Sequence, residues 1–365
     1  MGKKLLYITT NIEGFGGVSR ILSVKLNYLI EKFGYEIYVL NSSRNGDEFF
    51  YSFNEKIKFY HFKKKRPNIL NILDFKNSVI KIVKYTNPNI IVNCDNGLKG
   101  SLIPFFLRED IPIIYERHCG RDIKGETFFD NLKIKLSNFI VDLNINKYEA
   151  FIVPNKHSYN HWKGKNVYDI QNPLWFEFPS KASALENKVA IAVGRCAFEK
   201  QYDILIRIWK EVVDEYPEWV LKIYGAEQCP DNLKRLVKDL RVSNCIEFCK
   251  PTNDIEQIYL NASMLLNTSS SEEFGLAIME AMAYGLPVIA FSNTFGPKTL
   301  IDDEKSGFLV KKDDFKTYAE SVNLLISDKN LRQSLGNNAR NGLGKFDLVQ
   351  TMKLWQNLFQ SINNF

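Results

Sequence analysis

Long apolar runs are missing from this sequence: none reaches the ~18 residues that a membrane-spanning helix requires. The apolar stretch at the amino terminus is too short for a secretory leader, and Leu6 stands where a myristoylation signal needs Ser or Thr. We therefore expect a cytoplasmic protein that meets lipid, if at all, peripherally on the inner face of the cell membrane.

Cysteine and histidine are scarce, with six and four residues in a chain of 365. No two cysteines have the Cys-x-x-Cys spacing, which excludes the common zinc sites and a disulfide-rich secreted domain. We predict reduced core thiols at all six positions, which are Cys94, Cys119, Cys196, Cys229, Cys245 and Cys249.

An Asp-x-Asp sequence is also absent, and with it an obvious carboxylate clamp for magnesium on a diphosphate. We predict no metal and no other cofactor. Any diphosphate would have to be neutralised by Lys or Arg side chains.

Positive charge is concentrated in the first half of the chain. Residues 1–172 carry 26 Lys and Arg against 17 Asp and Glu, whereas residues 173–365 carry 22 against 25. Such asymmetry favours an anionic partner for the first half, either nucleic acid or an acidic membrane surface. No recognised nucleic-acid-binding module is visible, so we do not predict a nucleic-acid partner.

The periodicity of the sequence predicts two α/β domains, in keeping with one domain per ~150 residues. Short β-rich runs alternate with amphipathic stretches, as in doubly wound parallel sheets. In the first series the predicted strands are 5–9, 36–40, 56–62, 90–94, 111–117 and 150–154, with helices at 18–32 and 69–85. In the second series the strands are 189–193, 219–224, 245–249, 264–267 and 287–291, with a helix at 202–215.

Proline and small residues separate the two series. We predict domains at 1–172 and 188–345, a linker at 173–187 and a final segment at 346–365. Three helical patterns follow Asp313, and the last, at 348–362, has an apolar face that could pack back onto the first domain. Ligands of such sheets bind at the carboxyl ends of the strands, where we expect the two domains to share a cleft.

The segment 269–288 is the most informative part of the second domain. A loop of small residues there precedes a helix that starts near Phe274 and Gly275, and the first N–H groups of a helix form an anion site. Glu280 is the only charge in the apolar stretch 276–283, so it needs hydrogen-bond partners. A ribose diol would satisfy it, as would a nearby Lys or a backbone donor; Glu272 is either a sugar ligand or an ordinary loop residue.

Two further segments follow predicted strands and contain residues that could bind a phosphate group. Arg195 and Lys200 come directly after the strand 189–193, and a guanidinium fork matches a phosphate. Gly16 and Gly17 lie in a glycine-rich turn after the first strand, but Ser19 stands where the G-x-G-x-x-G fingerprint needs Gly. A surface Arg and Lys beside a helix is the alternative interpretation of the first pair.

Glu116 and His118 end the predicted strand 111–117. This position lets both side chains reach a ligand at the carboxyl edge of the sheet. Which of the two is the functional residue is left open, and a structural histidine is the alternative.

These segments together resemble glycosyltransferase family 4. The stretch Glu272 to Val288 is similar to that family's acidic pair with Phe-Gly-Leu between, followed by Glu-Ala-Met-Ala-x-Gly-x-Pro-Val. The Gly194-Arg195 and Lys200 spacing resembles its diphosphate motif, and Gly16-Gly17-Val18 its first glycine loop. The resemblance covers nearly the whole chain and implies the GT-B fold, in which the second of two Rossmann-like domains holds most of the donor.

The resemblance also implies a retaining transferase that needs no metal for chemistry and uses a UDP- or GDP-linked sugar. Arg195 and Lys200 would neutralise the diphosphate, and Glu280 would hold the ribose. The leaving phosphate would itself take the proton of the acceptor, and we find no dedicated base.

The donor sugar has its own set of implied contacts. Glu272 and the backbone at Phe274, Gly275 and Leu276 would hold it, and His118 would lie near its reacting carbon. The chain departs from the family at Glu273, where Gly is common, and in the Glu-Arg-His ending at 116–118.

The acceptor is harder to predict. Basic residues at 61–66 and aromatic residues at 49–53 and 104–108 suit an anionic bilayer, with each Lys or Arg contributing ~1 kcal/mol. We therefore predict a glycan or lipid-linked oligosaccharide acceptor for a surface polysaccharide; the alternative is a solvated loop with core aromatics. Two rival functions stay open, a GT-B nucleotide-sugar epimerase and a catalytically silent lectin-like or membrane-binding homologue.

Overall fold

A computed structural model describes residues 3–42, 49–62, 70–107, 111–121, 123–226 and 229–362. The chain forms two compact units, each described here by itself. Unit 1 contains Met1–Trp175 and Leu348–Phe365, and unit 2 contains Phe176–Asp347. The chain thus enters unit 2 within the segment 173–187 and returns to unit 1 after Asp347.

Unit 1 is built on a seven-stranded parallel sheet in the order β3-β2-β1-β4-β5-β6-β7. The central strands are buried on both faces, which explains their continuous apolar sequences. The strands are β1 Lys4–Thr9, β2 Glu36–Asn41, β3 Lys58–His61, β4 Ile90–Asn93, β5 Ile113–Glu116, β6 Ala150–Val153 and β7 Val167–Asp169.

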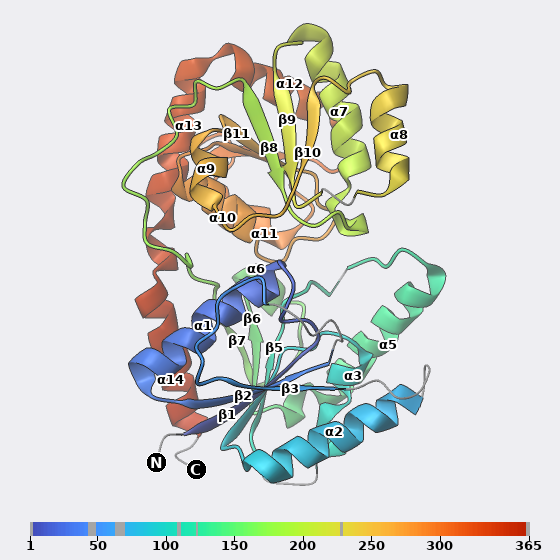
Figure 1. The fold of residues 1–365 in the computed structure, drawn as a ribbon, viewed down its shortest axis with the longest axis vertical. Helices are drawn as coiled ribbons and strands as arrows, with labels where there is room; N and C mark the ends of the chain where they lie inside the picture. The colour runs from blue at the N-terminus through green and yellow to red at the C-terminus, as the bar shows by residue number, and fades with distance from the viewer. Residues whose placement is uncertain are drawn as a thin grey trace. The chain divides into compact units, whose positions relative to one another are not determined.

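Helices cover both faces of this sheet (Figure 1). Side chains of α1 and α14 form the core on one face, and α2 lies against the other. The helices are α1 Gly17–Phe33, α2 Leu70–Thr86, α3 Leu98–Ser101, α4 Ile103–Phe106, α5 Phe128–Asn144, α6 Lys156–Tyr159 and α14 Leu348–Ile362, with a 3-10 turn η1 Ile145–Lys147. Met352, Trp355 and Phe359 of α14 are buried in that core, as its apolar face predicts.

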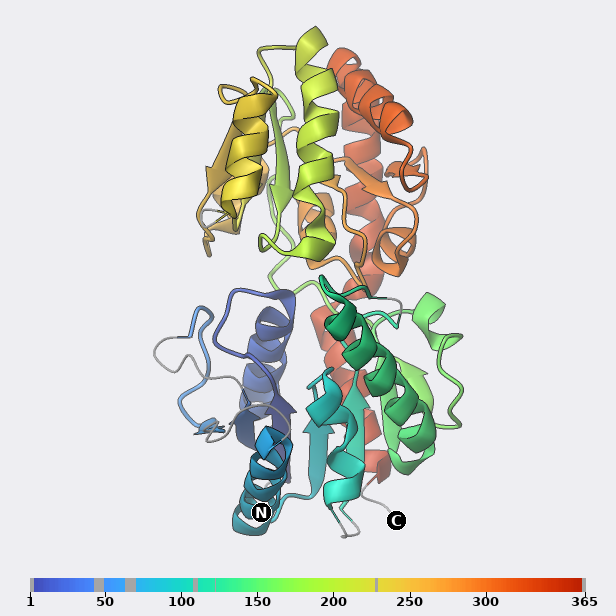
Figure 2. The ribbon, with the colours of Figure 1, turned by 90° about the vertical axis from the view of Figure 1, so that its right-hand side faces the viewer.

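Unit 2 has a six-stranded parallel sheet in the order β10-β9-β8-β11-β12-β13. Its strands are β8 Val189–Val193, β9 Val220–Tyr224, β10 Ile246–Cys249, β11 Met264–Asn267, β12 Val288–Phe291 and β13 Gly307–Val310. Its helices are α7 Tyr202–Glu215, α8 Asp231–Asp239, α9 Ile255–Leu260, α10 Leu276–Ala283, α11 Phe295–Leu300, α12 Phe315–Ser327 and α13 Lys329–Asn341, with 3-10 turns η2 Phe198–Lys200 and η3 Gly342–Phe346. In Figure 2 the helices α7 and α8 lie side by side in front of this sheet.

The strand order reverses at one point in each sheet. In unit 1 the reversal lies between β1 and β4, and in unit 2 between β8 and β11. Ligands of doubly wound sheets bind outside the carboxyl ends of the strands at this point. The loops there are the ones that carry the glycine turn at 14–17, the segment 194–200 and the segment 268–275.

The prediction of two doubly wound parallel-sheet domains with a last helix on the first is confirmed. The prediction of six reduced thiols is wrong for one pair, because Cys196 and Cys229 form a disulfide. These residues lie in loops that follow the neighbouring strands β8 and β9, so the sheet brings them together although 33 positions separate them. The other four cysteines are free thiols, and of these only Cys94 is fully buried.

Within the described residues, no helix is both long and apolar enough to cross a membrane.

Candidate functional site

The two motif loops of unit 2 are bonded to each other. The hydroxyl of Thr268, after β11, donates to the carbonyl of Lys200 at 3.0 Å. The N–H of Ser270 donates to the carbonyl of Glu199 at 2.7 Å. Since β8 and β11 are adjacent strands, the sheet places both loops at the same edge, and these hydrogen bonds fix their register.

Two ion pairs occupy this edge. Lys200 Nζ lies 2.7 Å from Glu272 Oε2, and the two side chains are 19% and 17% exposed. Arg195 Nη2 lies 3.6 Å from Glu199 Oε1, and the Arg195 side chain is 58% exposed. Both cations therefore reach solvent and are accessible to an anionic ligand. Of the two ion pairs, that of Arg195 has the longer distance, and more than half of the Arg195 side chain is exposed to solvent.

The helix α10 starts beside these ion pairs. Gly275 precedes it with φ of +92°, a left-handed conformation that side-chain-bearing residues adopt only with strain. The backbone here is also tightly packed, because a Cβ at Gly296 would lie 2.5 Å from the carbonyl oxygen of Phe274. Phe274 is buried, with its ring 5.7 Å from that of Phe346. The result is a rigid helix start next to Glu272 and Lys200, with the geometry of an anion site.

Glu280 is the fifth residue of α10 and is buried. The hydroxyl of Tyr259, in α9, donates to its Oε2 at 2.6 Å. The requirement that this carboxylate be hydrogen-bonded is therefore met in part by a tyrosine, a partner that sequence reasoning did not identify. Glu273, the departure from the family pattern, is buried as well.

The glycine turn of unit 1 leads into α1. Gly16 precedes the helix in an extended conformation and Gly17 is its first residue. The turn is held from inside, since the N–H of Gly14 donates to Asn11 Oδ1 at 3.1 Å and the hydroxyl of Ser19 donates to the Asn11 carbonyl at 3.0 Å. Ser19 thus stabilises the turn at the position where a dinucleotide fingerprint would need Gly.

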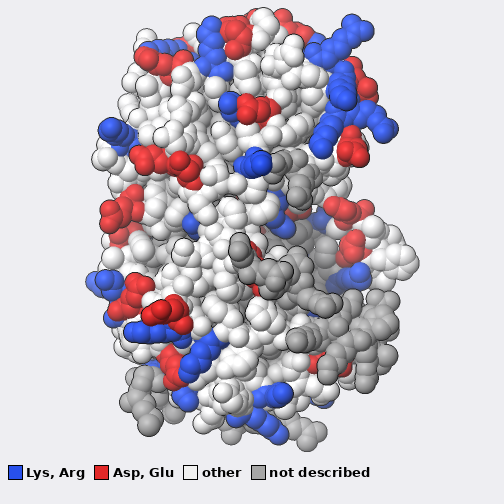
Figure 3. All heavy atoms as spheres, viewed as in Figure 1, with Lys and Arg blue, Asp and Glu red and all other residues white. Residues whose placement is uncertain are grey.

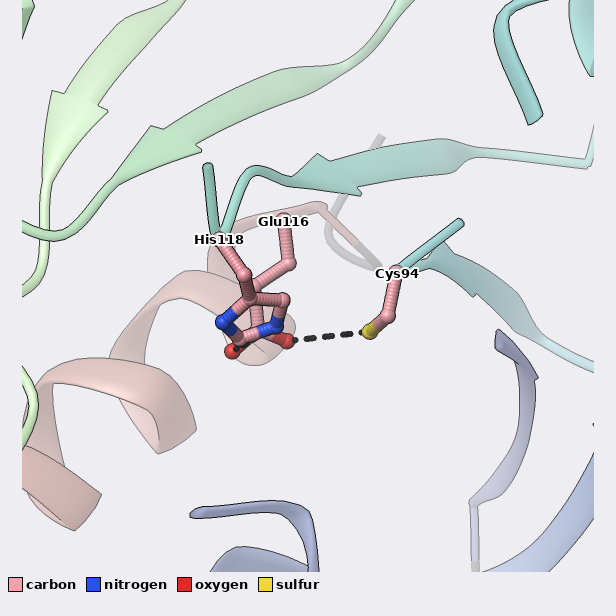
Figure 4. Close-up of side chains that lie close together, drawn as sticks. All are labelled: Cys94, Glu116 and His118. Carbon is pink, nitrogen blue, oxygen red and sulfur yellow. Dashed lines mark hydrogen bonds and ion pairs between the residues drawn. The ribbon is translucent and has the colours of Figure 1, made fainter. Parts of the chain in front are cut away.

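Glu116 and His118 belong to a buried cluster of unit 1 (Figure 4). The Lys25 ammonium, from α1, forms an ion pair with Glu116 Oε2, and both side chains are at most 5% exposed. His118 Nε2 lies 3.5 Å from Glu116 Oε1, and the Cys94 thiol donates to Glu116 Oε2 at 3.4 Å. Lys25 Nζ also lies 3.9 Å from the centre of the Trp355 ring of α14.

The surroundings of Glu116 determine its ionisation and that of its neighbours. Burial by itself raises the pKa of Glu116, but the charges of Lys25 and His118 and the hydrogen bonds of Lys25 and Cys94 hold this pKa below 4.5. Burial, together with Lys25 and Arg117, lowers the pKa of His118 below 6.5 against the opposing effect of Glu116. At neutral pH the cluster therefore holds a Glu116 carboxylate and a neutral His118 imidazole.

Cys94, Glu116 and His118 offer three potential metal ligands whose donor atoms lie within 4.8 Å of one another. A cation there would compete with the Lys25 ammonium for the same carboxylate. Burial also raises the pKa of Cys94 well above 9.0, which keeps its thiol protonated. The described residues thus favour a hydrogen-bond network over a metal centre.

The predicted basic and aromatic surface of unit 1 is described only in part. Residues 63–66 and Arg108 lie outside the described residues. The aromatic run at 49–53 packs internally, with the rings of Phe49 and Phe53 5.0 Å apart and the Tyr51 hydroxyl donating to the carbonyl of Phe15. Membrane contact through this run stays a prediction.

Basic side chains also gather in unit 2, although the second half of the chain is acidic overall. Figure 3 shows Lys and Arg crowded over α8, where Lys234, Arg235 and Lys238 are exposed. The acidic net charge of the second half therefore does not exclude a basic surface on it.

Sequence reasoning singled out two groups of candidate residues, and each group lies within one unit. Unit 2 brings together Arg195, Lys200, Glu272 and the start of α10. Unit 1 brings Glu116 and His118 together around Lys25, which sequence reasoning missed. The sole signal for Lys25 was a charge on the apolar side of the predicted helix 18–32.

Comparison with known proteins identifies the fold of the whole chain and matches a family model to part of it. Residues 175–342 match the family model described as glycosyl transferases group 1. A protein of Haemophilus influenzae named uncharacterized glycosyltransferase is 25% identical over 98% of this chain and 99% of its own length. The amylovoran biosynthesis glycosyltransferase AmsD of Erwinia amylovora is also 25% identical, over 97% of this chain and 99% of its own.

A solved structure of TarM from S. aureus, a G117R mutant in complex with fondaparinux, alpha-GlcNAc-glycerol and UDP, superposes on this chain with a TM-score of 0.78. It is 15% identical and covers 98% of this chain and 99% of its own, so the likeness concerns the fold. Residues 175–342, most of unit 2, thus match the glycosyl transferases group 1 model, and the chain has the GT-B fold of two parallel α/β units.

Proposed function

We propose that this protein is a retaining glycosyltransferase that moves a sugar from a nucleotide-diphosphate donor to a glycan acceptor. The observation that carries the proposal is the edge of the unit 2 sheet, where Arg195, Lys200, Glu272 and the start of α10 meet at the reversal of strand order. The family match of this segment and the names of the full-length relatives support transfer over the epimerase and the silent homologue.

Arg195 and Lys200 neutralise the diphosphate in this proposal. Cleavage of the bond between sugar and phosphate develops negative charge on the leaving diphosphate, and fixed cations stabilise that charge at ~3 kcal/mol each. The exposed guanidinium of Arg195 can bind two phosphate oxygens at once. Lys200 reaches the phosphate from a position that Glu272 already fixes.

Glu272 and the backbone at Phe274, Gly275 and Leu276 hold the donor sugar. The carboxylate accepts hydrogen bonds from sugar hydroxyls while it keeps Lys200 in place. The first N–H groups of α10 point toward the same edge and donate to oxygens of the ligand. His118, neutral at pH 7, contacts the reacting sugar, as the family resemblance implies.

Glu280 holds the ribose in this proposal. The Tyr259 hydroxyl fixes one carboxylate oxygen, which orients the group and limits the geometry in which it accepts from the two ribose hydroxyls. A UDP- or GDP-linked sugar satisfies these contacts, and the presence of UDP in the TarM complex supports the uridine nucleotide.

The reaction retains configuration without a metal ion. A leaving-phosphate oxygen accepts the proton of the acceptor hydroxyl as the new glycosidic bond forms, and the nucleoside diphosphate leaves with that proton. The acceptor is a glycan, lipid-linked in a surface polysaccharide pathway; the name of AmsD supports polysaccharide synthesis.

The test is a panel of UDP-, GDP- and ADP-sugars, scored in EDTA for release of the nucleoside diphosphate and for the anomeric configuration of the product. Arg195→Ala should lose ~100-fold or more in turnover. Arg235→Ala, an exposed arginine of α8, is the matched control and should keep normal turnover. Release of no nucleotide from any donor, or equal turnover of the two variants, would overturn the proposal.

A further inference from the structure

The helix α5 presents most of its apolar side chains to solvent. Six of them are 44% to 78% exposed: Phe128, Phe129, Leu132, Leu136, Phe139 and Leu143. At ~100° per residue these six positions fall within an arc of about 100°. They form one continuous band, which we call the α5 stripe. A surface helix of a globular domain normally turns such a band toward the core.

The inward face of α5 is mainly polar. Its buried residues are Ser137, Asn138, Val141 and Asn144. Of these, Val141 is the residue that joins the hydrophobic core of the unit. The helix therefore has an inverted amphipathic pattern, and burial of apolar surface does not explain why it lies where it does.

Polar contacts fix this orientation instead. Asn138 Oδ1 accepts from Arg117 Nη2 at 3.0 Å, and Asn138 Nδ2 donates to the carbonyl of Arg121 at 2.9 Å. Arg121 Nη1 in turn donates to Asp142 Oδ1 at 2.7 Å, and the Thr127 side chain caps the first turn. Rotating the helix to bury the stripe would break these bonds.

The stripe is accessible within unit 1. Figure 1 shows α5 at the outer edge of the unit, and in Figure 2, where that side faces the viewer, no other helix or strand lies in front of it. Nearby, Phe105 is also exposed, and Lys147 Nζ lies 4.5 Å from the centre of its ring.

Lysines border the stripe on both sides. At the same ~100° per residue, Lys135 lies about 20° beyond one edge and Lys133 about 40° beyond the other. The acidic groups of the helix are paired, Asp130 with Lys133 at 3.4 Å and Asp142 with Arg121. An apolar band bordered by lysines is typical of a helix lying in a membrane interface, where lysine stems can extend along the apolar surface and the ammonium groups can reach the headgroups.

We propose that the α5 stripe docks on an anionic lipid surface, with α5 in the plane of the interface and Lys133 and Lys135 at the level of the headgroups. The observations that support this proposal concern α5 and not the edge of the unit 2 sheet, so the proposal does not depend on donor chemistry. Combined with the proposed function, it would bring the enzyme to an acceptor carried by lipid.

The test is cosedimentation of the full chain with vesicles of phosphatidylglycerol and phosphatidylcholine, compared with phosphatidylcholine alone. The variant Leu132→Ser, Phe139→Ser, Leu143→Ser should bind at least 10-fold more weakly. The matched control is Leu324→Ser, Val349→Ser, Leu354→Ser, three exposed apolar residues of α12 and α14, and it should bind as the unchanged chain does. The six side chains substituted in these two variants are all exposed. Both variants should therefore keep the unfolding temperature and the donor hydrolysis of the unchanged chain.

Lys133→Gln and Lys135→Gln should each weaken binding to the anionic vesicles by about 5-fold at low salt, with less effect at high salt. Failure of the unchanged chain to bind anionic vesicles, or equal loss in the two triple variants, would overturn the proposal. Equal binding to both vesicle types would overturn the anionic preference. A concentration-dependent dimer that the α5 variant abolishes, without vesicle binding, would assign the stripe to a second copy instead.

Discussion

The charged clusters of the two units differ in how far their charges are satisfied within the protein. In unit 1 Lys25 and Glu116 are both at most 5% exposed and paired with each other. In unit 2 Lys200 and Glu272 are close to one-fifth exposed, and the Arg195 side chain is more than half exposed. Removing one partner of a buried pair leaves an isolated charge in the interior, whereas a solvated cation can exchange its partner for a ligand. The first cluster therefore suits holding structure in place, and the second suits binding.

The same comparison distinguishes Glu116 from His118, which the sequence left as two alternatives for the functional residue. Glu116 Oε2 accepts from Lys25 and Cys94 inside unit 1. The buried His118 Nε2 lies 3.5 Å from Glu116 Oε1 and has no hydrogen-bond partner among the described residues. His118 is therefore the better candidate for ligand contact. Glu116 and Lys25 would act on it indirectly, by fixing the position of its ring.

The largest expected effect is the loss of the buried ion pair. Lys25→Met should lower the free energy of unfolding by ~3–5 kcal/mol, because Glu116 would remain buried without its ammonium. Lys222→Met, at the more exposed pair with Glu247, should cost ~1 kcal/mol or less. Urea unfolding of both variants makes the comparison, and equal losses would show that burial does not distinguish the two pairs.

The same substitution in unit 2 should affect catalysis more than folding. Lys200→Met should lower donor turnover by ~100-fold, since one fixed cation at the leaving group is lost. Its unfolding free energy should fall by only ~1 kcal/mol, as for other partly exposed pairs. Steady-state hydrolysis of the preferred donor and urea unfolding together check this, and a large stability loss with normal turnover would reverse the assignment.

Acid should weaken unit 1 in two stages. The pKa of His118 is lowered from 6.5, so below pH 6.5 the unfolded chain binds a proton that the folded chain does not, and stability falls as pH decreases. Glu116, with a pKa lowered from 4.5, adds a second loss of the same sign below pH 4.5. Each group contributes a slope of at most ~1.4 kcal/mol per pH unit.

His118→Asn should remove the first stage and keep the second. Unfolding free energies measured from about pH 7 to about pH 4 would show this as a flatter curve above pH 4.5. An unchanged slope between pH 6.5 and 4.5 would mean that another group titrates there.

The smallest effect is expected at the ribose contact. Tyr259→Phe removes the hydroxyl that donates to Glu280 and should weaken nucleotide binding by a few fold, since a net hydrogen bond contributes about 1 kcal/mol. Tyr284→Phe is the control, because its ring stacks on that of Tyr259 without an assigned donor contact. Equal affinity of the two variants would remove Tyr259 from the site.

Local pattern was enough to predict the elements that bury a regular face. The strand Val189–Val193 and the helices Tyr202–Glu215 and Leu348–Ile362 have the predicted bounds, because a parallel strand is apolar throughout and these helices repeat apolar residues at helical spacing. The helix α5 also repeats apolar residues at helical spacing but was not predicted, and this pattern does not reveal that its apolar face is exposed. The strand β7 has three residues, too few for any period.

The loops that form the candidate site could be predicted from the sequence, but the residues that pair with its charged side chains could not. Arg195, Lys200 and Glu272 follow strands, and strand ends meet at one edge of a parallel sheet. The partners depend on contacts between distant positions: Lys25 and Glu116 are 91 residues apart, and Lys200 and Glu272 are 72 apart. The disulfide between Cys196 and Cys229 likewise follows from the adjacency of two strands, which spacing alone does not reveal.

Calorimetric titration of nucleoside diphosphate in EDTA tests the central claim most directly, that the exposed cations of unit 2 bind the diphosphate without a metal. The account predicts that UDP or GDP binds the unchanged chain in EDTA, and that Arg195→Ala weakens this binding by at least 10-fold while Arg235→Ala leaves it unchanged. Binding that disappears in EDTA, or that is the same in Arg195→Ala as in the unchanged chain, would contradict it.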